Sequence, residues 1–236
     1  MIVCDSISVL LIWFFMSNLI LKHKIAGING FGRFGLHLLK YWLDRSRQAN
    51  FSIQYINDYV LREADIVRIM HTDPYVRFDD YHISRAKDKL SITDRLGKRY
   101  LIQLSRKKQE KIPWLGKVDL FLECSGKHTD ARTCKPFLVD ATRLVIISAT
   151  SLNADRTLIY GFNNNDFTPS DRIISYGSCT VNAYVPIAHY INSHYRILES
   201  DVNIIHNTPK HRLPHWSMHT LQRKETTLQK SAPILL

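Results

Sequence analysis

The feature that most constrains this chain is a glycine pattern, Gly30-Phe-Gly32-Arg-Phe-Gly35, which follows directly on a short apolar run at residues 25–29. Apolar residues recur at helical spacing after it: Phe34, Leu38, Leu39, Trp42 and Leu43. Residues 51–56 then alternate as a half-buried strand does. A strand, a glycine turn, a helix and a second strand make a parallel βαβ unit. The pattern therefore predicts an α/β fold with a parallel sheet.

Each glycine of a GxGxxG turn has its own physical role. The first permits a tight turn, the second lets a pyrophosphate approach the backbone, and the third lets the helix pack closely on the sheet. The helix N-terminus offers free N–H groups and the positive end of its dipole to phosphate oxygens. A lone GxGxxG also arises by chance, but its position between strand and helix favours a dinucleotide site at Gly30, Gly32 and Gly35.

An acidic residue, Asp58, ends the second predicted strand, 28 residues after Gly30. A carboxylate at this place accepts hydrogen bonds from the ribose diol of a dinucleotide. It would also repel a 2′-phosphate, and it therefore favours NAD over NADP. The alternative is an acid that caps a helix or closes a loop. Because Asp58 accompanies the glycine turn, we interpret it as a cofactor residue.

The rest of the chain continues the α/β pattern. It predicts, in order, a hairpin, a buried strand, a helix and another buried strand: residues 90–104, 118–124, 129–138 and 143–149. Near-continuous apolar strands separated by helices indicate a sheet covered on both faces. We therefore expect a doubly wound domain at residues 24–150, followed by a second domain at residues 151–236.

The four cysteines form no short-spaced pair, so any reactive thiol is expected to act alone: Cys4, Cys124, Cys134 and Cys179. Cys179 opens a predicted helix, whose dipole stabilises a thiolate. A lone cysteine is more often a buried structural residue. Cys179, however, has polar neighbours that are unusual around a core thiol: Ser178, Thr180 and Asn182. We interpret it as a nucleophile.

His206 ends a further predicted strand at residues 202–205. A solitary histidine there is usually a hydrogen-bonded structural residue, and it becomes a candidate base only together with Cys179. A rival interpretation joins it to a histidine series on a metal-binding helix face: His211, His215 and His219. Pro214 interrupts that series, and no carboxylate or cysteine joins it, so we expect no metal site.

Six segments resemble the phosphorylating, NAD-dependent glyceraldehyde-3-phosphate dehydrogenase family: INGFGRFG (28–35), IND (56–58), KIPW (111–114), LECSG (122–126), VIISATS (145–151) and IISYGSCTVNA (173–183). The 27-residue interval from Cys179 to His206 also matches that family's nucleophile and base. The resemblance covers roughly residues 24–208. It implies a Rossmann-type NAD-binding domain, followed by an incomplete α+β catalytic domain.

The resemblance implies NAD as cofactor, and a phosphorylated aldehyde and inorganic phosphate as substrates. Cys179 would attack the aldehyde carbon, and His206 would keep the thiol ionised and take the hydroxyl proton as hydride leaves. Phosphate would then attack the thioester. The resemblance also implies contacts by position: Arg33 and Phe34 at the pyrophosphate turn, Lys107 near the adenine, Ser148 along the cofactor, and Ser178, Thr180 and Thr208 at substrate or phosphate.

Several positions depart from the family pattern. Pro209 stands where the family has a phosphate-contacting threonine, Thr150 replaces a proline, and His71-Thr72-Asp73-Pro74 replaces Ser-Thr-His-Gly. The chain also ends about a hundred residues short of a complete family member. Two functions therefore stay open: a dehydrogenase of glyceraldehyde 3-phosphate or erythrose 4-phosphate, and a catalytically inactive remnant that at most binds NAD. Complete family members form homo-oligomers, but we do not expect one for this chain.

Charge and the N-terminus constrain the function less. The formal net charge of +11 favours anionic ligands, but the basic residues are dispersed without a nucleic-acid-binding signature, so we expect no nucleic acid. The apolar stretch at residues 7–21 has 15 residues, fewer than the roughly 20 of a membrane span. We interpret residues 1–23 as an apolar extension, with Met16 as the more natural start, and a membrane anchor is the alternative. We expect a cytoplasmic protein.

Overall fold

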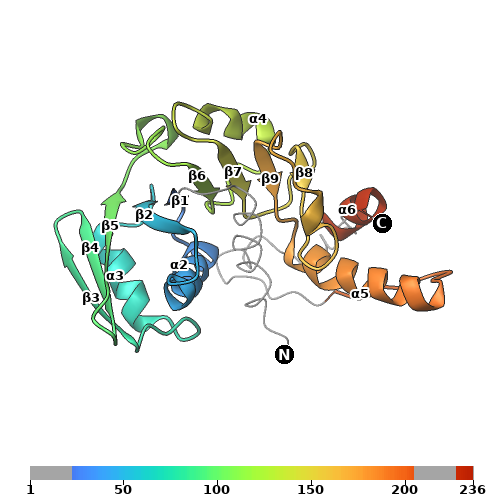
Figure 1. Cartoon of the computed structure of the whole chain (residues 1–236), viewed down its shortest axis with the longest axis horizontal. Coiled ribbons are helices and arrows are strands. Elements are labelled where there is room, and N and C mark those ends of the chain that lie inside the picture. Colours follow the sequence, from blue (N-terminus) through green and yellow to red (C-terminus); the bar gives the residue numbers. More distant parts are fainter. Residues whose placement is uncertain (1–22, 205–226, 236) are drawn as a thin grey trace, which may run out of the picture.

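The computed structural model describes residues 23–204 and 227–235, which form one nine-stranded sheet and five α-helices (Figure 1). The strands are β1 (Lys24–Asn29), β2 (Phe51–Asn57), β3 (Tyr81–Ala86), β4 (Lys89–Asp94), β5 (Arg99–Ser105), β6 (Leu120–Glu123), β7 (Leu144–Ile147), β8 (Arg156–Thr157) and β9 (Ile173–Ser175). The helices are α2 (Arg33–Arg45), α3 (Glu63–Thr72), α4 (Ala131–Cys134), α5 (Cys179–Tyr195) and α6 (Thr227–Leu235).

Six parallel strands form the centre of the sheet in the order β5-β2-β1-β6-β7-β9. When these six are numbered along the chain, their order is 3-2-1-4-5-6, which is that of doubly wound, Rossmann-type folds. The antiparallel strands β3 and β4 extend the sheet beyond β5, and the short strand β8 ends it beside β9. The expected α/β, doubly wound class is confirmed.

Helices cover both faces of the sheet, as near-continuous apolar strands predict. α2 and α3 lie on one face, where Leu39 and Ile66 belong to the same buried cluster as Ile28 of β1 (Figure 1). The other face carries α4 and a stack of aromatic rings in which Phe121 of β6 lies 4.0 Å from Phe137 between centroids. Neighbouring residues of β6 and β7 thus pack into two different cores.

Two predicted elements differ from the structure. The helix expected at residues 129–138 is a single turn, α4, continued as a 3₁₀ turn at Lys135–Phe137, because Pro136 has no backbone N–H to donate. Residues 202–204 form no strand, since no strand of the described part pairs with them, and residue 205 lies outside that part. The hairpin expected at residues 90–104 is confirmed as β4 and β5.

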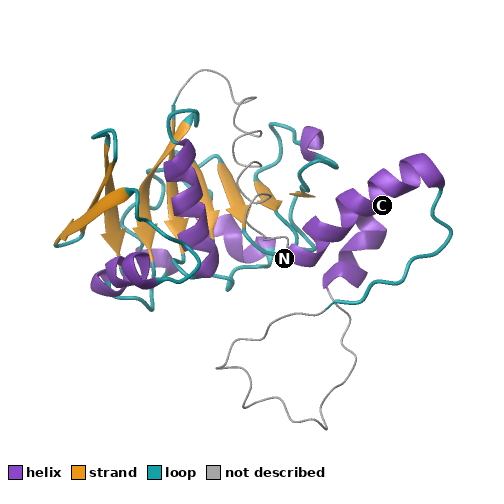
Figure 2. Cartoon of the chain, turned by 90° about the horizontal axis from the view of Figure 1, so that it is seen from below, coloured by secondary structure: helices purple, strands orange, loops and turns teal. Residues whose placement is uncertain are grey.

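The sheet continues past residue 150, where we expected the first domain to close. β9 lies between β7 and β8 and ends only at Ser175. Gly177, with a φ of +70°, then leads the chain into α5, which packs against α6 through Val181, Val185 and Leu228. Figure 2 shows these two helices side by side, beyond the sheet. A separate domain at residues 151–236 stays a prediction.

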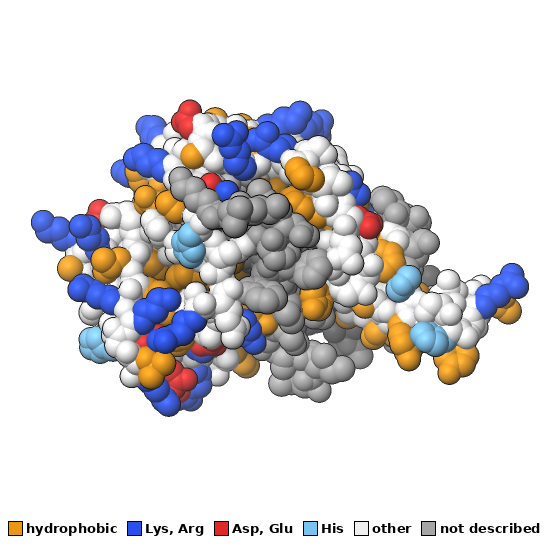
Figure 3. All heavy atoms as spheres, in the orientation of Figure 1, with side chains coloured by type: hydrophobic (Ala, Val, Ile, Leu, Met, Phe, Trp, Pro, Cys, Tyr) orange, Lys and Arg blue, Asp and Glu red, His pale blue; other side chains and the backbone are white. Residues whose placement is uncertain are grey.

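Two further observations concern the distribution of basic side chains and the character of the helices. Lys and Arg side chains are spread over the face seen in Figure 3 and do not gather in one patch there. Of the helices in the described ranges, none combines the length and the apolar character needed to cross a lipid bilayer. The apolar stretch at residues 7–21 lies outside these ranges.

Candidate functional site

The glycine turn joins β1 to α2 at the carboxyl edge of the sheet. Gly30 has a φ of +96°, which favours glycine, and its N–H donates to the Asn57 carbonyl at 2.7 Å. A β-carbon on Gly30 would lie 2.4 Å from the Ser125 backbone, and one on Gly35 would lie 2.3 Å from the Gly30 oxygen. One on Gly32 would meet no described atom within 4 Å. Gly30 and Gly35 are therefore required by packing, whereas Gly32 leaves space open over the helix start.

A cleft of about 500 Å³ opens over this turn. Its walls come from the segments that follow β1, β2 and β6, and include Asn29, Gly32, Arg33, Asp58, Tyr59 and Ser125. β1 pairs with β2 on one side and with β6 on the other, so the strand order reverses there. Open α/β sheets bind their ligands at such a switch point, and the cleft has the volume of an ordinary ligand pocket.

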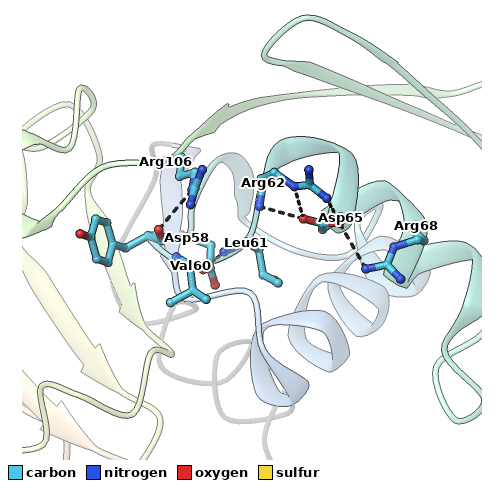
Figure 4. A network of polar contacts seen from close by, with 8 residues as sticks. Asp58, Val60, Leu61, Arg62, Asp65, Arg68 and Arg106 are labelled. Atoms are coloured by element: carbon cyan, nitrogen blue, oxygen red, sulfur yellow. Dashed lines mark hydrogen bonds and ion pairs between the residues drawn. The ribbon is translucent and has the colours of Figure 1, made fainter.

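Asp58 follows β2 and lies against the glycine turn. Its Oδ2 accepts the N–H of Phe31 at 2.7 Å. Its Oδ1 accepts the N–H groups of Val60 and Leu61, both at 2.8 Å (Figure 4). A carboxylate has about four lone-pair sites, so roughly one stays available for a ribose hydroxyl. The residue is 9% exposed and lines the cleft. Asp58 thus closes the loop after β2, as the alternative interpretation holds, and also faces the cleft.

Arg33 and Phe34, at the start of α2, have different surroundings. The Nη1 of Arg33 pairs with Asp73 Oδ2 at 2.5 Å, and its guanidinium lies 5.3 Å from the centre of the Tyr75 ring. Arg33 and Asp73 both line the cleft. The ring of Phe34 packs against Tyr176, with 6.0 Å between centroids, at the border of the larger core. The structure therefore brings Arg33 to the cleft, while Phe34 supports the turn by packing.

Lys107 and Ser148 lie at the same edge of the sheet but do not line the cleft. The N–H of Lys107 donates to Asn57 Oδ1 and its carbonyl accepts from Asn57 Nδ2, each at 3.0 Å, while its side chain is exposed. Ser148 follows β7, and its N–H donates to the Glu123 carbonyl at 2.9 Å. Its hydroxyl contacts the Cys124 thiol. Their cofactor contacts stay predictions.

A buried carboxyl group lies beneath the cleft and was not among the residues predicted from the sequence. Glu123, the last residue of β6, is 1% exposed and accepts the side-chain amide of Asn29 at 2.6 Å and the N–H of Ser125 at 2.8 Å. Burial raises the pKa of Glu123 above the ordinary glutamate value, although the hydrogen bonds from Ser125 and Asn29 act in the opposite direction. The signal for it was a charged residue inside the apolar run of residues 118–124.

Cys179 is the first residue of α5, and its side chain is exposed. Ser178 caps the helix: its Oγ accepts the N–H of Val181 at 3.2 Å and lies 2.9 Å from Thr180 Oγ1. The Nδ2 of Asn182 donates to the Ser178 carbonyl at 2.9 Å. The polar residues that distinguish this cysteine therefore fix the start of the helix, and the thiol stands at the positive end of the helix dipole.

The other two cysteines of the described part belong to the two hydrophobic cores. Cys124 and Cys134 are both buried. Burial raises the pKa of both thiols, that of Cys134 to about 12. A thiol that stays protonated is a poor nucleophile. Of these three cysteines, Cys179 has the surroundings of a reactive thiol.

The expected base and one expected phosphate contact, His206 and Thr208, lie outside the described residues, as do His211, His215 and His219. The structure therefore places the predicted nucleophile but not its predicted partner. Within the described ranges, no three His, Cys, Asp or Glu side chains gather where they could hold a metal ion.

Known proteins match the chain over the same region. Residues 24–131 match the family model of the glyceraldehyde 3-phosphate dehydrogenase NAD-binding domain. Glyceraldehyde-3-phosphate dehydrogenase of Lactobacillus delbrueckii subsp. bulgaricus is 31% identical over 183 residues, which are 76% of this chain and 53% of that protein. The protein of the same name from Cereibacter sphaeroides is 29% identical over 77% of this chain, and the cytosolic one of Pisum sativum 30% over 79%, again with 53% of each relative covered.

The chain thus spans about half the length of the curated relatives it matches. The matched domain contains the glycine turn, Asp58 and the loop after β6, which together form the cleft. The chain belongs to the glyceraldehyde-3-phosphate dehydrogenase family, and its residues 24–131 are the NAD-binding domain of that family.

Proposed function

We propose that the cleft over the glycine turn holds NAD, with the pyrophosphate over Gly32 and the adenosine ribose at Asp58. The observation that carries this proposal is the open space at Gly32, where a β-carbon would meet no described atom within 4 Å. Gly32 is also the N-cap of α2, and no side chain makes a capping hydrogen bond there. The free N–H groups of the helix start are left for phosphate oxygens.

The surroundings of Asp58 favour NAD over NADP. The carboxylate lines the cleft, and the three backbone N–H groups that it accepts leave roughly one lone pair for a ribose hydroxyl. A 2′-phosphate at that place would bring two negative charges together without a bridging proton. Lys107, held beside the end of β2 by Asn57, is proposed to lie near the adenine.

For the reaction, we propose oxidative phosphorylation of glyceraldehyde 3-phosphate. Cys179, as a thiolate, adds to the carbonyl carbon, and the former carbonyl oxygen takes up a proton. His206 accepts that hydroxyl proton as the C–H electron pair leaves, and the C=O bond re-forms as a thioester. NAD supplies the hydride acceptor. A phosphate oxygen then displaces the Cys179 thiolate to give an acyl phosphate, with Ser178, Thr180 and Thr208 as contacts for substrate and phosphate.

A second candidate is a protein that binds NAD without turnover. One observation favours it: Pro209 stands where the family pattern has a phosphate-contacting threonine. Erythrose 4-phosphate stays an alternative substrate of the first candidate, because a thiolate attacks the aldehyde group that both compounds carry. We propose the cytoplasm as the location, in keeping with the cytosolic pea relative.

Two measurements separate the candidates. Calorimetry with NAD and NADP tests the cleft, and NADH formation with either aldehyde and inorganic phosphate tests the thiol. NADH formation that is lost in Cys179→Ser and kept in Cys134→Ala supports the dehydrogenase. NAD binding without NADH formation supports the second candidate. A folded chain that does not bind NAD overturns both.

A further inference from the structure

Polar side chains end four adjacent parallel strands beneath the cleft. Ser105, Asn57, Asn29 and Glu123 are the last residues of β5, β2, β1 and β6, and they lie opposite one another in register. All four are buried, Asn57 and Glu123 to within 1% of full burial. Buried polar groups need partners, so the direction of each hydrogen bond in this row has consequences for its neighbours.

The backbone of Lys107 fixes the orientation at one end of the row. Its N–H donates to Asn57 Oδ1 and its carbonyl accepts from Asn57 Nδ2, each at 3.0 Å. A backbone N–H can only donate and a carbonyl can only accept, so the Asn57 amide has one permitted orientation. The Ser105 hydroxyl donates to the same Oδ1 at 2.9 Å.

The orientation of the Asn57 amide determines that of the next side chain in the row. Asn57 Nδ2 donates to Asn29 Oδ1 at 2.9 Å, which turns the Asn29 Nδ2 towards Glu123 Oε2, at 2.6 Å. From the other side, the N–H of Ser125 donates to Glu123 Oε1 at 2.8 Å, and the Ser125 hydroxyl donates to the same oxygen. Donors therefore reach both oxygens of Glu123. A carboxylate, which only accepts, satisfies them all.

The two residues that Glu123 holds are both part of the cleft. Asn29 and Ser125 line it from β1 and from the loop after β6. The Ser125 hydroxyl also accepts the N–H of Lys127 at 3.1 Å, and the Ser125 backbone lies 2.4 Å from the place of a β-carbon on Gly30. The position of the loop against the glycine turn thus depends on the carboxylate beneath it.

We propose that Glu123, in its ionised form, is a positioning residue of the cofactor cleft, which fixes Asn29 and Ser125 without touching the cofactor itself. This rests on the proposed NAD site. If Glu123 is replaced by glutamine, its NH₂ group faces either the Asn29 amide or the Ser125 N–H, and one donor is opposed to another donor. If Glu123 is protonated, it loses one acceptor position and the charge that strengthens these hydrogen bonds. In both cases the loop after β6 is held less firmly on β1.

The pH dependence of NAD binding separates positioning from simple charge. If Glu123 acted only through its charge, protonation would strengthen NAD binding, because repulsion of the pyrophosphate would disappear. If Glu123 instead acts by positioning Asn29 and Ser125, protonation has the opposite effect, and NAD affinity falls. Because burial raises the pKa of Glu123, this fall begins above the pH at which an exposed glutamate titrates. The titratable groups that interact with Glu123 are His128, Cys124 and Cys134.

Calorimetry with NAD on the full chain and on Glu123→Gln tests the proposal. We expect the variant to bind NAD about tenfold more weakly near neutral pH. As the pH is lowered, the affinity of the variant stays constant, whereas that of the wild type falls. Glu110→Gln, an exposed acid in a 3₁₀ turn, is the matched control and should bind as the wild type does.

A double variant covers the case in which Glu123→Gln does not fold. Asn29→Asp with Glu123→Gln moves the carboxylate one position along the row, and each donor again meets an acceptor, so we expect it to recover the thermal stability lost in the single variant. A wild-type NAD affinity that is constant or rises as the pH falls overturns the proposal, as does an unchanged affinity in folded Glu123→Gln. A wild-type chain that does not bind NAD overturns the proposed function instead.

Discussion

The backbone oxygen of Gly30 lies 2.3 Å from the point where a β-carbon on Gly35 would stand. No side chain fits at that distance, and neither group can move without opening the turn between β1 and α2. Gly32 lies between them with open space in front of it. The same three-glycine pattern therefore contains two residues that the fold requires and one, Gly32, that we propose to serve the ligand, and substitution can separate the two roles.

Gly32→Ala should fold normally and lose NAD binding. Its φ of −76° suits any residue, so we expect a stability change below about 1 kcal/mol, while the new methyl group occupies the space proposed for the pyrophosphate. NAD affinity, measured by calorimetry, should fall at least about tenfold. Gly35→Ala is the contrasting variant and should lose about 1–3 kcal/mol of stability in urea unfolding. Equal NAD affinity in Gly32→Ala and the wild type would place the pyrophosphate elsewhere.

Asp58→Asn should reduce the preference of the cleft for NAD over NADP. The amide keeps one oxygen for the N–H groups of Val60 and Leu61 but turns its NH₂ towards the N–H of Phe31, so we also expect a stability loss of about 1–3 kcal/mol. NAD affinity should fall, while NADP affinity falls less or rises, since the repelling charge is gone. Asp80→Asn, at an exposed acid, is the control. An unchanged ratio of the two affinities would remove Asp58 from the ribose site.

Asp171 should make stability depend on pH. Burial acts to raise the pKa of this carboxyl, but hydrogen bonds from Arg156 and from the N–H of Thr168, at 3.0 and 2.7 Å, lower it overall. A lowered folded-state pKa adds stability above the unfolded-state value near pH 4, and this stability is lost as the pH falls through the folded-state value.

Asp171→Asn should therefore be less stable than the wild type at neutral pH, by about 1 kcal/mol, because Arg156 is only a third exposed and Asp171 is buried. The difference should shrink below about pH 4 in urea unfolding. Asp79→Asn breaks an exposed pair with Arg77 and should change stability by less than about 0.5 kcal/mol at either pH. A difference for Asp171→Asn that stays constant with pH would contradict the lowered pKa.

Local spacing predicts the parts of this site that depend on neighbours in the chain. The glycines and Asp58 follow predicted strands directly, so their place at the carboxyl edge of the sheet follows from the amino-acid sequence alone. Glu123 could not be understood that way, because its partner Asn29 is 94 residues away and meets it only through strand pairing. Phe34 differs for another reason: a residue in the first turn of a helix can face a ligand or the core, and spacing alone does not show that its ring packs against Tyr176.

Cys179 should be the first of the described cysteines to react with an electrophile. It is exposed at the start of α5, whereas Cys124 and Cys134 are 8% and 0% exposed, and burial raises the pKa of both thiols. With limiting iodoacetamide on the native protein, mass spectrometry should find the label on Cys179, and in urea on the other two as well. Earlier labelling of Cys124 or Cys134 in the folded chain would remove the assignment of the nucleophile. Selective labelling without NADH formation would show that the thiol is reactive but that the substrate is not held in attack geometry. Correct orientation of the reacting groups can lower the activation barrier by about 7–11 kcal/mol.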